Sequence, residues 1–373
     1  MSILILSFLA SIVISLAITP FIAQFARRRG IMDVPDQGVG ADFTSAPAGG
    51  NKSRPYDRKR HARPTPLLGG IAIFVAFTIV LGAIAWITGA PFEGRINPFE
   101  LLVVFTGGLI LLIGGYFDDR YRLRPRQQLL FPVIAVLIVA AAGIGISKIT
   151  NPFGGIIYLA PWATVAFTIV WLLGTTYTTK LLDGLDGLVA GITAIGALLI
   201  AALSLTEQYY QPDVAVIALA LAGACLGFLP FNFYPARIFL GEGGSTLCGF
   251  LLGILAIISG GKVATTLLVL GVAAVDAVAV IIQRVLRGAS PVTGDRRHLH
   301  FLLLDIGLSH RAATLLFWAM AAGFGVTTIF LQAQQKLITL GALVAVAVGL
   351  SIAAAIQKQK KPPIPENGGS SAS

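Results

Sequence analysis

The stretch LLDGLDGLVAGI, residues 181–192, places two aspartates, Asp183 and Asp186, between two long apolar segments. Residues 162–174 before it and 192–205 after it contain no charged side chain. A helix needs roughly 20 apolar residues to cross the hydrocarbon core of a bilayer. The pattern therefore predicts two spanning helices joined by an acidic turn, and with them a membrane fold.

Composition supports a membrane fold for the whole chain. Of its 373 residues, 56% are hydrophobic and only 12% are charged, whereas soluble domains carry about 25% charged residues. We predict an all-α integral membrane domain over residues 1–356 with about eleven transmembrane helices. These are expected at residues 3–25, 67–89, 100–117, 128–147, 161–181, 188–205, 213–230, 244–261, 263–285, 312–331 and 337–356.

The positions of lysine and arginine predict the orientation. When the connections are assigned alternately to the two sides, 23 of the 27 basic residues fall on one side. Positively charged loops stay cytoplasmic, so we expect the N-terminus outside, the C-terminus in the cytoplasm, and location in the inner or plasma membrane. The net charge of +10 then reflects topology and attraction to anionic lipid, and no nucleic-acid partner is expected.

Two segments differ in composition from the membrane domain. Residues 37–57 are rich in Gly, Ala, Ser and Pro, and we interpret them as a mobile cytoplasmic insertion. Residues 357–373 are interpreted as a disordered cytoplasmic tail. The two cysteines lie in apolar segments, so no disulfide framework is expected.

Adjacent carboxylates close one apolar segment in GGYFDDRYRLRPRQQ, residues 114–128. Asp118 and Asp119 would repel each other unless a cation lay between them, and Mg²⁺, which binds carboxylates together with substrate phosphates, would serve. The alternative is a charged cap at the membrane surface, which is the favoured interpretation for the arginines, Arg126 included. The active site is thus expected on the cytoplasmic face.

The opening stretch has two interpretations. If the helix continues through it, Asp183 and Asp186 share one face; otherwise Asp and Gly form a tight turn for conformational reasons. Lys180, just before it, either extends to the membrane surface or contacts a phosphate.

A third motif, FNFYPARIFLGEGGS, covers residues 231–245. Glu242 is a candidate metal ligand, and the glycine-rich turn could present backbone N–H groups to an anion. Phe239 could stack on a base, although packing is the simpler role.

A fourth motif, in residues 287–311, contains Asp295, Arg296, His298 and His300. A zinc site is conceivable, but arginine presents a planar fork that suits a diphosphate better. His310 is interpreted as a surface residue. Asp276 lies inside an apolar segment, where an acid suggests function, and a helix-packing role is equally open.

Carboxylates for a metal and cations for phosphates together indicate phosphoryl transfer, in which positioning and charge neutralisation dominate. Their place at the membrane surface suggests one lipid substrate and one cytosolic substrate.

These motifs carry a family resemblance. MDVPD (32–36), RKRHARPTPLLGG (58–70), FDD (117–119), DGLDGLVAG (183–191), NFYPARIFLGEGGS (232–245) and SPVTGDRRHLH (290–300) occur in this order. Together they resemble the polyprenyl-phosphate N-acetylhexosamine-1-phosphate transferases of glycosyltransferase family 4. The HLH form resembles the WecA/TagO branch rather than the related MraY branch.

The resemblance implies an activity and its partners. The enzyme would transfer GlcNAc-1-phosphate, or a related N-acetylhexosamine-1-phosphate, from a UDP-amino sugar to undecaprenyl phosphate and release UMP. This would be the first membrane step of a cell-envelope glycopolymer. It implies Mg²⁺ as cofactor, with Mn²⁺ as a substitute, and a homodimer is a further expectation.

The resemblance also implies residue roles. Catalytic positions correspond to Asp118, Asp119, Asp183 and Asp186. The metal would be bound by Glu242 with Asp119. Nucleotide and diphosphate contacts would come from Asn232, Phe239, His298 and His300; to these the chemistry of the residues themselves, rather than the resemblance, adds Lys180, Asp295 and Arg296. Further contacts, to the lipid phosphate, are assigned to His61, Thr65 and Arg126.

Four positions depart from the family pattern. Glu242 replaces the usual aspartate, Tyr177 and Lys180 replace two asparagines, and Gln128 stands where a lysine is usual. Alternative functions remain: an MraY-like phospho-MurNAc-pentapeptide transferase, a secondary transporter whose acids form an ion pathway, or an inactive homologue that acts as a scaffold.

Overall fold

The computed structural model describes residues 2–34, 64–88, 97–151, 153–260, 262–286 and 298–360. Twelve α-helices form within these ranges. They are α1 (Ser2–Arg29), α2 (Gly69–Thr88), α3 (Pro98–Tyr121), α4 (Pro125–Ala141), α5 (Pro161–Leu182), α6 (Leu188–Ser204), α7 (Pro212–Asn232), α8 (Gly241–Ile258), α9 (Val263–Leu286), α10 (Leu299–Asp305), α11 (His310–Phe330) and α12 (Ala333–Lys360). The prediction of an all-α architecture is confirmed.

The expected number of spans is confirmed in part. Each of the eleven predicted segments coincides with one helix, but in the described part of the chain only nine helices are long and apolar enough to cross a membrane. The other two, α4 and α6, have 17 residues each, which at 1.5 Å per residue is about 26 Å. Gly187 ends the α5–α6 turn in a left-handed conformation, so α6 cannot begin earlier. The nine long apolar helices make the chain a multi-pass membrane protein.

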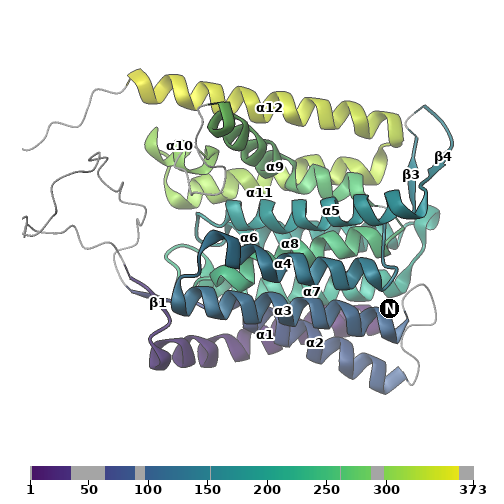
Figure 1. The fold of residues 1–373 in the computed structure, drawn as a ribbon, viewed down its shortest axis with the longest axis horizontal. Coiled ribbons are helices and arrows are strands. Elements are labelled where there is room, and N and C mark those ends of the chain that lie inside the picture. The colour runs from purple at the N-terminus through teal and green to yellow at the C-terminus, as the bar shows by residue number, and fades with distance from the viewer. Residues whose placement is uncertain are drawn as a thin grey trace, which may run out of the picture.

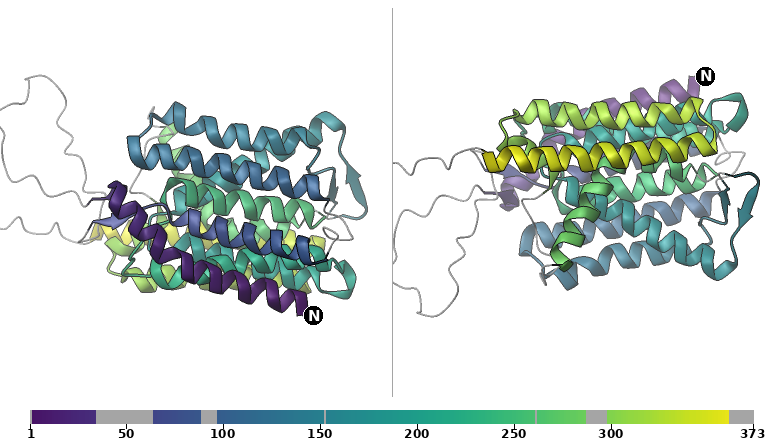
Figure 2. Two further views of the ribbon diagram at one scale, coloured as in Figure 1. Left: turned by 90° about the horizontal axis from the view of Figure 1, so that it is seen from below. Right: turned by 90° about the horizontal axis from the view of Figure 1, so that it is seen from above.

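The helices lie side by side along one direction (Figure 1). The helix α8 lies at the centre and is almost wholly buried, in contact with α3, α5 and α6. By contrast, α1 and α12 lie at the periphery. The helix α9 crosses the direction of its neighbours, as the right-hand view of Figure 2 shows. Its C-terminal half exposes Val278, Ile282 and Val285, as expected for a surface in contact with lipid.

Glycines bring three helices into close contact just below the site. A Cβ atom on Gly115 of α3 would overlap the backbone of Gly243 in α8, and one on Gly70 of α2 would overlap Gly244. Small residues at such crossings let membrane helices approach each other closely. The contact sets the ends of α3 and α8 beside each other, and with them Asp119 and Glu242.

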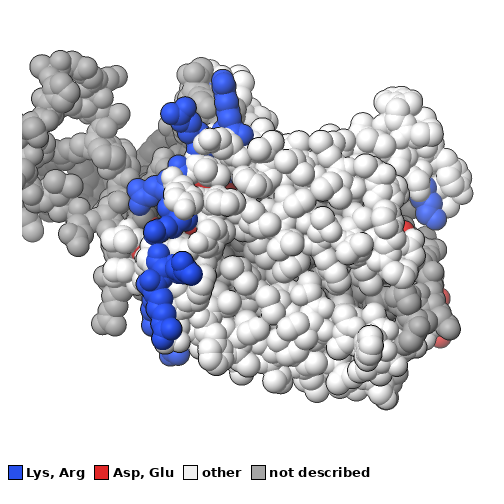
Figure 3. Space-filling view, turned by 60° about the horizontal axis from the view of Figure 1, so that its bottom comes forward, with Lys and Arg blue, Asp and Glu red and all other residues white. Residues whose placement is uncertain are grey.

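Lysine and arginine collect at one end of the bundle, where α1 and α3 end and α8 begins; we call this the basic end (Figure 3). A short two-stranded sheet lies there, formed by β1 (Met32–Asp33) and β2 (Thr65–Pro66). A second hairpin, β3 (Lys148–Thr150) and β4 (Ile156–Tyr158), extends from the opposite end (Figure 1).

Some predictions lie wholly or partly outside the described residues. They include the insertion at 37–57 and the tail at 357–373, of which only residues 357–360 are described, as the last turn of α12.

Candidate functional site

A cavity of about 300 Å³ opens at the basic end. Its polar lining includes four carboxylates that the sequence singled out, Asp119, Asp183, Asp186 and Glu242. They come from the end of α3, the turn between α5 and α6, and the start of α8. The full lining is Asp33, Leu67, Asp119, Asp183, Gly184, Leu185, Asp186, Asn232, Tyr234, Phe239, Gly241, Glu242, Phe301, Leu304 and His310.

Asp119 joins α3 to the first turn of α8. Its Oδ1 accepts a hydrogen bond from the backbone N–H of Glu242 at 3.1 Å. Its Oδ2 is buried with no hydrogen-bond partner in the described structure. A buried oxygen without a partner is costly, so this atom is suited to accept a ligand that the protein alone does not supply.

Asp118 has a different role in this structure. Its Oδ1 accepts hydrogen bonds from the backbone N–H of Leu123 at 2.8 Å and from Gln128 Nε2 at 3.0 Å. Asp118 closes the turn between α3 and α4 and is absent from the cavity lining. Its assignment to the lipid phosphate therefore stays a prediction.

Lys180 links Glu242 to Asp118 through Gln128. Its ammonium is in direct contact with the Glu242 carboxylate and donates to Gln128 Oε1 at 3.0 Å. Gln128 in turn donates to Asp118. The ammonium therefore forms an ion pair beside the cavity, and both predicted roles of Lys180 stay predictions.

The acidic stretch is a turn, not a continuous helix. The helix α5 ends at Leu182, and α6 begins after Gly187, whose φ is +76°. Both aspartates still face the cavity, because the whole turn from Asp183 to Asp186 lines it. Asp183 is exposed to this cavity, yet the surrounding protein withdraws it from bulk water. This desolvation, followed by the charges of Glu242 and Asp186, raises the pKa of Asp183 to about 8.

Residues that we expect to contact the nucleotide also hold the loop between α7 and α8 in place. Asn232 accepts from the N–H of Gly187 at 3.1 Å and donates to the carbonyl of Ile238 at 3.0 Å. Asp186 Oδ2 accepts from the N–H of Ala236 at 2.9 Å. Asn232 and Phe239 both line the cavity, so the side chain of Asn232 combines a structural role with access to a ligand.

The two histidines of the fourth motif lie behind the cavity wall. His298 and His300 are 6% and 1% exposed, and their rings stack 5.6 Å apart. Burial, and then the neighbouring His298, lower the pKa of His300 to about 3, so its ring is neutral near pH 7. Asp276, whose role the sequence left open, pairs with His298 Nδ1 at 2.8 Å.

Other expected residues are not brought to the cavity. Thr65 is buried in β2, where it pairs with Asp33, and Arg126 is exposed in the first turn of α4. His61, Asp295 and Arg296 lie outside the described residues.

Two residues that line the cavity, Asp33 and His310, were not predicted as site residues from the sequence. The interpretation of His310 as a surface residue is wrong: it lines the cavity and stacks on Tyr234 at 4.8 Å. Asp33 also lines the cavity, and its only signal was its place in the MDVPD motif. Both reach the site through tertiary contacts that local sequence does not encode.

The residues present fit a divalent cation that is completed by substrate. Among the described residues, no group of three potential ligands is arranged to hold a metal by itself. Mg²⁺ is commonly bound by one or two carboxylates together with waters and substrate phosphates. Asp119, with its unpartnered Oδ2, and the neighbouring Glu242 can supply those carboxylates.

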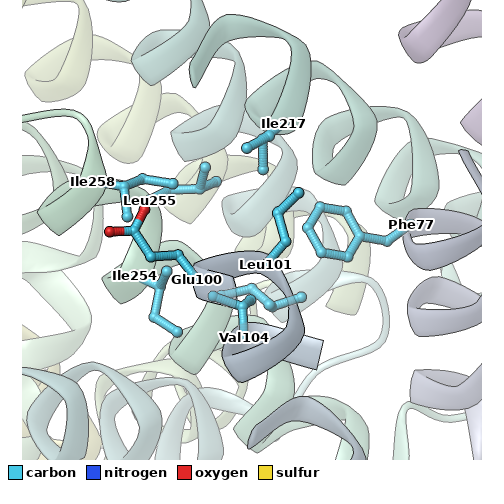
Figure 4. A pocket seen from close by; sticks show the side chains of 9 residues that line it. Phe77, Glu100, Leu101, Val104, Ile217, Ile254, Leu255 and Ile258 are labelled. Carbon is cyan, nitrogen blue, oxygen red and sulfur yellow. The ribbon is translucent and has the colours of Figure 1, made fainter. Parts of the chain in front are cut away.

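A second hollow, of about 10 Å³, lies among α2, α3, α7 and α8 near the opposite end (Figure 4). Its lining is apolar except for Glu100. A volume of this size holds about one water molecule, so it is a packing gap rather than a ligand site.

Comparison with known proteins agrees with this geometry. Residues 101–260, which carry both acidic motifs and Glu242, match the model of glycosyl transferase family 4. A probable undecaprenyl-phosphate N-acetylglucosaminyl 1-phosphate transferase from Bacillus subtilis is 28% identical over 88% of this chain and 85% of its own length.

Two further relatives represent both branches of the resemblance. The decaprenyl-phosphate N-acetylglucosaminephosphotransferase of Mycolicibacterium smegmatis is 33% identical over 80% of each chain. A phospho-N-acetylmuramoyl-pentapeptide-transferase from Desulforudis audaxviator is 32% identical over 73% of this chain and 86% of its own length. The acidic cavity at the end of a helical membrane bundle and these long alignments show that the chain belongs to glycosyl transferase family 4, among the polyprenyl-phosphate N-acetylhexosamine-1-phosphate transferases.

Proposed function

We propose that this protein transfers GlcNAc-1-phosphate from UDP-GlcNAc to undecaprenyl phosphate and releases UMP. The observation that carries the proposal is the cavity into which Asp119, Asp183, Asp186 and Glu242 all face, at the basic end of the membrane bundle. The two relatives described above whose names specify GlcNAc-phosphate transfer align over 80% and 88% of this chain, a longer stretch than the 73% that the muramoyl-pentapeptide relative covers.

The position of the cavity supports a cytoplasmic active site. Basic residues surround the cavity end, and positively charged ends of membrane helices stay in the cytoplasm. We therefore propose that the N-terminus is outside, that the C-terminus is cytoplasmic, and that the cavity receives a nucleotide sugar from the cytosol. The same position argues against a secondary transporter, whose binding site lies near the bilayer midplane.

The chemistry is a displacement at phosphorus. A phosphate oxygen of the lipid attacks the phosphorus that carries the sugar, the bond from that phosphorus to the bridging diphosphate oxygen breaks, and UMP leaves with that oxygen. The second pKa of a phosphate is about 6, so the nucleophile is already ionised near pH 7 and needs no strong general base. The protein must instead orient two anions and offset their charge.

Different residues of the cavity would bind the metal, the diphosphate and the nucleotide. Asp119 and Glu242 would hold a divalent ion, which would neutralise charge on the diphosphate and on the departing UMP. Asn232 and Phe239 line the part of the cavity that we assign to uridine. Asp183 and Asp186 border the nucleotide, and Lys180 adds a positive charge beside Glu242.

The test is UMP release by the purified protein in detergent. The assay contains undecaprenyl phosphate, Mg²⁺ and a panel of UDP-sugars that includes UDP-GlcNAc and the muramoyl-pentapeptide nucleotide. Lipid- and metal-dependent UMP from UDP-GlcNAc alone would establish the donor. UMP only from the pentapeptide nucleotide would support the MraY-like function, and UDP binding without turnover would support the scaffold.

Asp119→Asn supplies the matched test of the site. The amide keeps the shape and an acceptor for the N–H of Glu242, but it removes the charge that a metal requires. We expect turnover to fall at least about 100-fold, as for loss of a group acting on the transition state, with the melting temperature retained. Asp183→Asn should behave similarly. Activity like that of the wild type in both variants would remove the assignment.

A further inference from the structure

The carboxylate of Asp276 is the buried acid that the proposed mechanism does not use. It lies in α9 and is 6% exposed. Its Oδ2 is 2.8 Å from His298 Nδ1, and its Oδ1 accepts a hydrogen bond from the backbone N–H of Leu299 at 2.8 Å. Both oxygens of a costly buried charge are thus occupied by the start of α10.

This pairing determines how His298 can act. An ionised carboxylate only accepts hydrogen bonds, so Nδ1 of His298 must carry a proton. In the neutral ring Nε2 then bears the lone pair. Such a carboxylate partner fixes both the tautomer and the orientation of a histidine ring.

The same contact fixes one wall of the cavity. His300 stacks on His298 and lies against Gly184, where an added Cβ would overlap its ring. The following residue, Phe301, lines the cavity together with Leu304. A shift of His298 would therefore move both the wall and the turn that carries Asp183.

We infer that Asp276 is a positioning residue of the transferase site. It fixes the His298 ring through Nδ1 and the start of α10 through the N–H of Leu299, and so holds α10, with Phe301 and Leu304 of the cavity wall, against the acidic turn. The inference rests on the proposed function for the reaction that the cavity carries out. The geometry among Asp276, His298 and Leu299 stands independently of it.

Asp276→Asn separates orientation from helix capping. The amide oxygen still accepts from Leu299, so α10 keeps its cap. The amide nitrogen donates to Nδ1, however, which moves the ring proton to Nε2 and weakens the charge-assisted contact that fixes His298 and the start of α10. We expect kcat to fall at least about tenfold while KM for the UDP-sugar changes less than about threefold, with an unchanged melting temperature.

The double variant tests whether Asp276 acts through His298. In a His298→Gln background, the additional Asp276→Asn change should alter kcat less than about twofold, because coupled residues are not additive. Glu100→Gln is the matched control. It exchanges the same charge at the opposite end of the bundle, and we expect unchanged activity. A kcat like that of the wild type in Asp276→Asn, or effects of the two changes that simply multiply, would overturn the inference.

A spectroscopic measurement keeps the inference testable if Asp276→Asn fails to fold. In wild-type protein with ¹⁵N-labelled histidine, the signal lost in His298→Gln should be that of a ring protonated at Nδ1. A ring protonated at Nε2 alone would overturn the inference. This outcome does not depend on turnover, so it also separates failure of the inference from failure of the proposed function, which wild-type UMP release tests directly.

Discussion

The ammonium of Lys180 lies where it competes with a metal for Glu242. The family pattern has a lysine at position 128 and an asparagine at position 180, whereas here Gln128 and Lys180 are in contact at 3.0 Å. The cation and the amide have therefore exchanged positions within one contact. The site keeps its positive charge but places it directly on a candidate metal ligand.

Replacing Lys180 by asparagine should strengthen metal binding. With the competing cation gone, we expect the Mg²⁺ concentration for half-maximal activity to fall by about tenfold, a plausible effect of one charge at short range. Turnover at saturating metal should be retained. The reciprocal variant Gln128→Lys with Lys180→Asn returns the cation to its usual position and serves as a control. A large loss of kcat in Lys180→Asn would show instead that Lys180 itself contacts the substrate.

Asp183 gives the apo protein a characteristic pH dependence. Its pKa is raised from 3.8 to about 8 by desolvation and then by Glu242 and Asp186, so the folded state retains a proton that the unfolded state loses. The resulting stability is complete below about pH 4 and is lost as pH rises through about 8. Thermal unfolding with EDTA should show a lower melting temperature at pH 9 than at pH 6. This difference should shrink in Asp183→Asn, and an equal difference in both proteins would contradict the assignment.

At the scale of elements, the glycine contacts between α3 and α8 place the site. Gly115→Ala would insert a methyl group against the Gly243 backbone and move Asp119 away from Glu242. Overpacking of this kind costs about 1–3 kcal/mol, so we expect a lower melting temperature together with weaker metal-dependent activity. Gly82→Ala in α2 is the matched control, since no atom lies within 4 Å of the added Cβ. Equal behaviour of the two variants would show that the crossing tolerates adjustment.

At the scale of the whole molecule, the basic end predicts the orientation. Cysteines introduced at Arg126, near the cavity end, and at Phe153, in the opposite hairpin, both occupy exposed positions. The native cysteines Cys225 and Cys248 are buried and should contribute little background. On intact cells, a membrane-impermeant maleimide should label Phe153→Cys but not Arg126→Cys, and permeabilisation should expose both. Labelling of Arg126→Cys alone would place the active site outside.

The sequence by itself determined the class of fold and most of the acidic site. Apolar length identifies membrane helices because a chain in lipid must satisfy its backbone hydrogen bonds within each segment. The distribution of lysine and arginine also predicted which helix ends gather, and Asp119, Asp183, Asp186 and Glu242 do meet in one cavity. Each of the eleven predicted spans coincides with a helix, and nine of these helices are long and apolar enough to cross a membrane by length and composition in the described residues.

Only the tertiary structure decided which side chains meet. It paired Asp276 with His298, joined Lys180 to Gln128, and turned Asp118 toward the turn after α3. It also brought His310 into the cavity. The physical reason is that lateral packing in a membrane depends on shape fit between helix surfaces, whereas apolar length and charge specify each helix separately. Partners that are distant in sequence, such as Asp276 and His298 on different helices, become defined only once those surfaces are in contact.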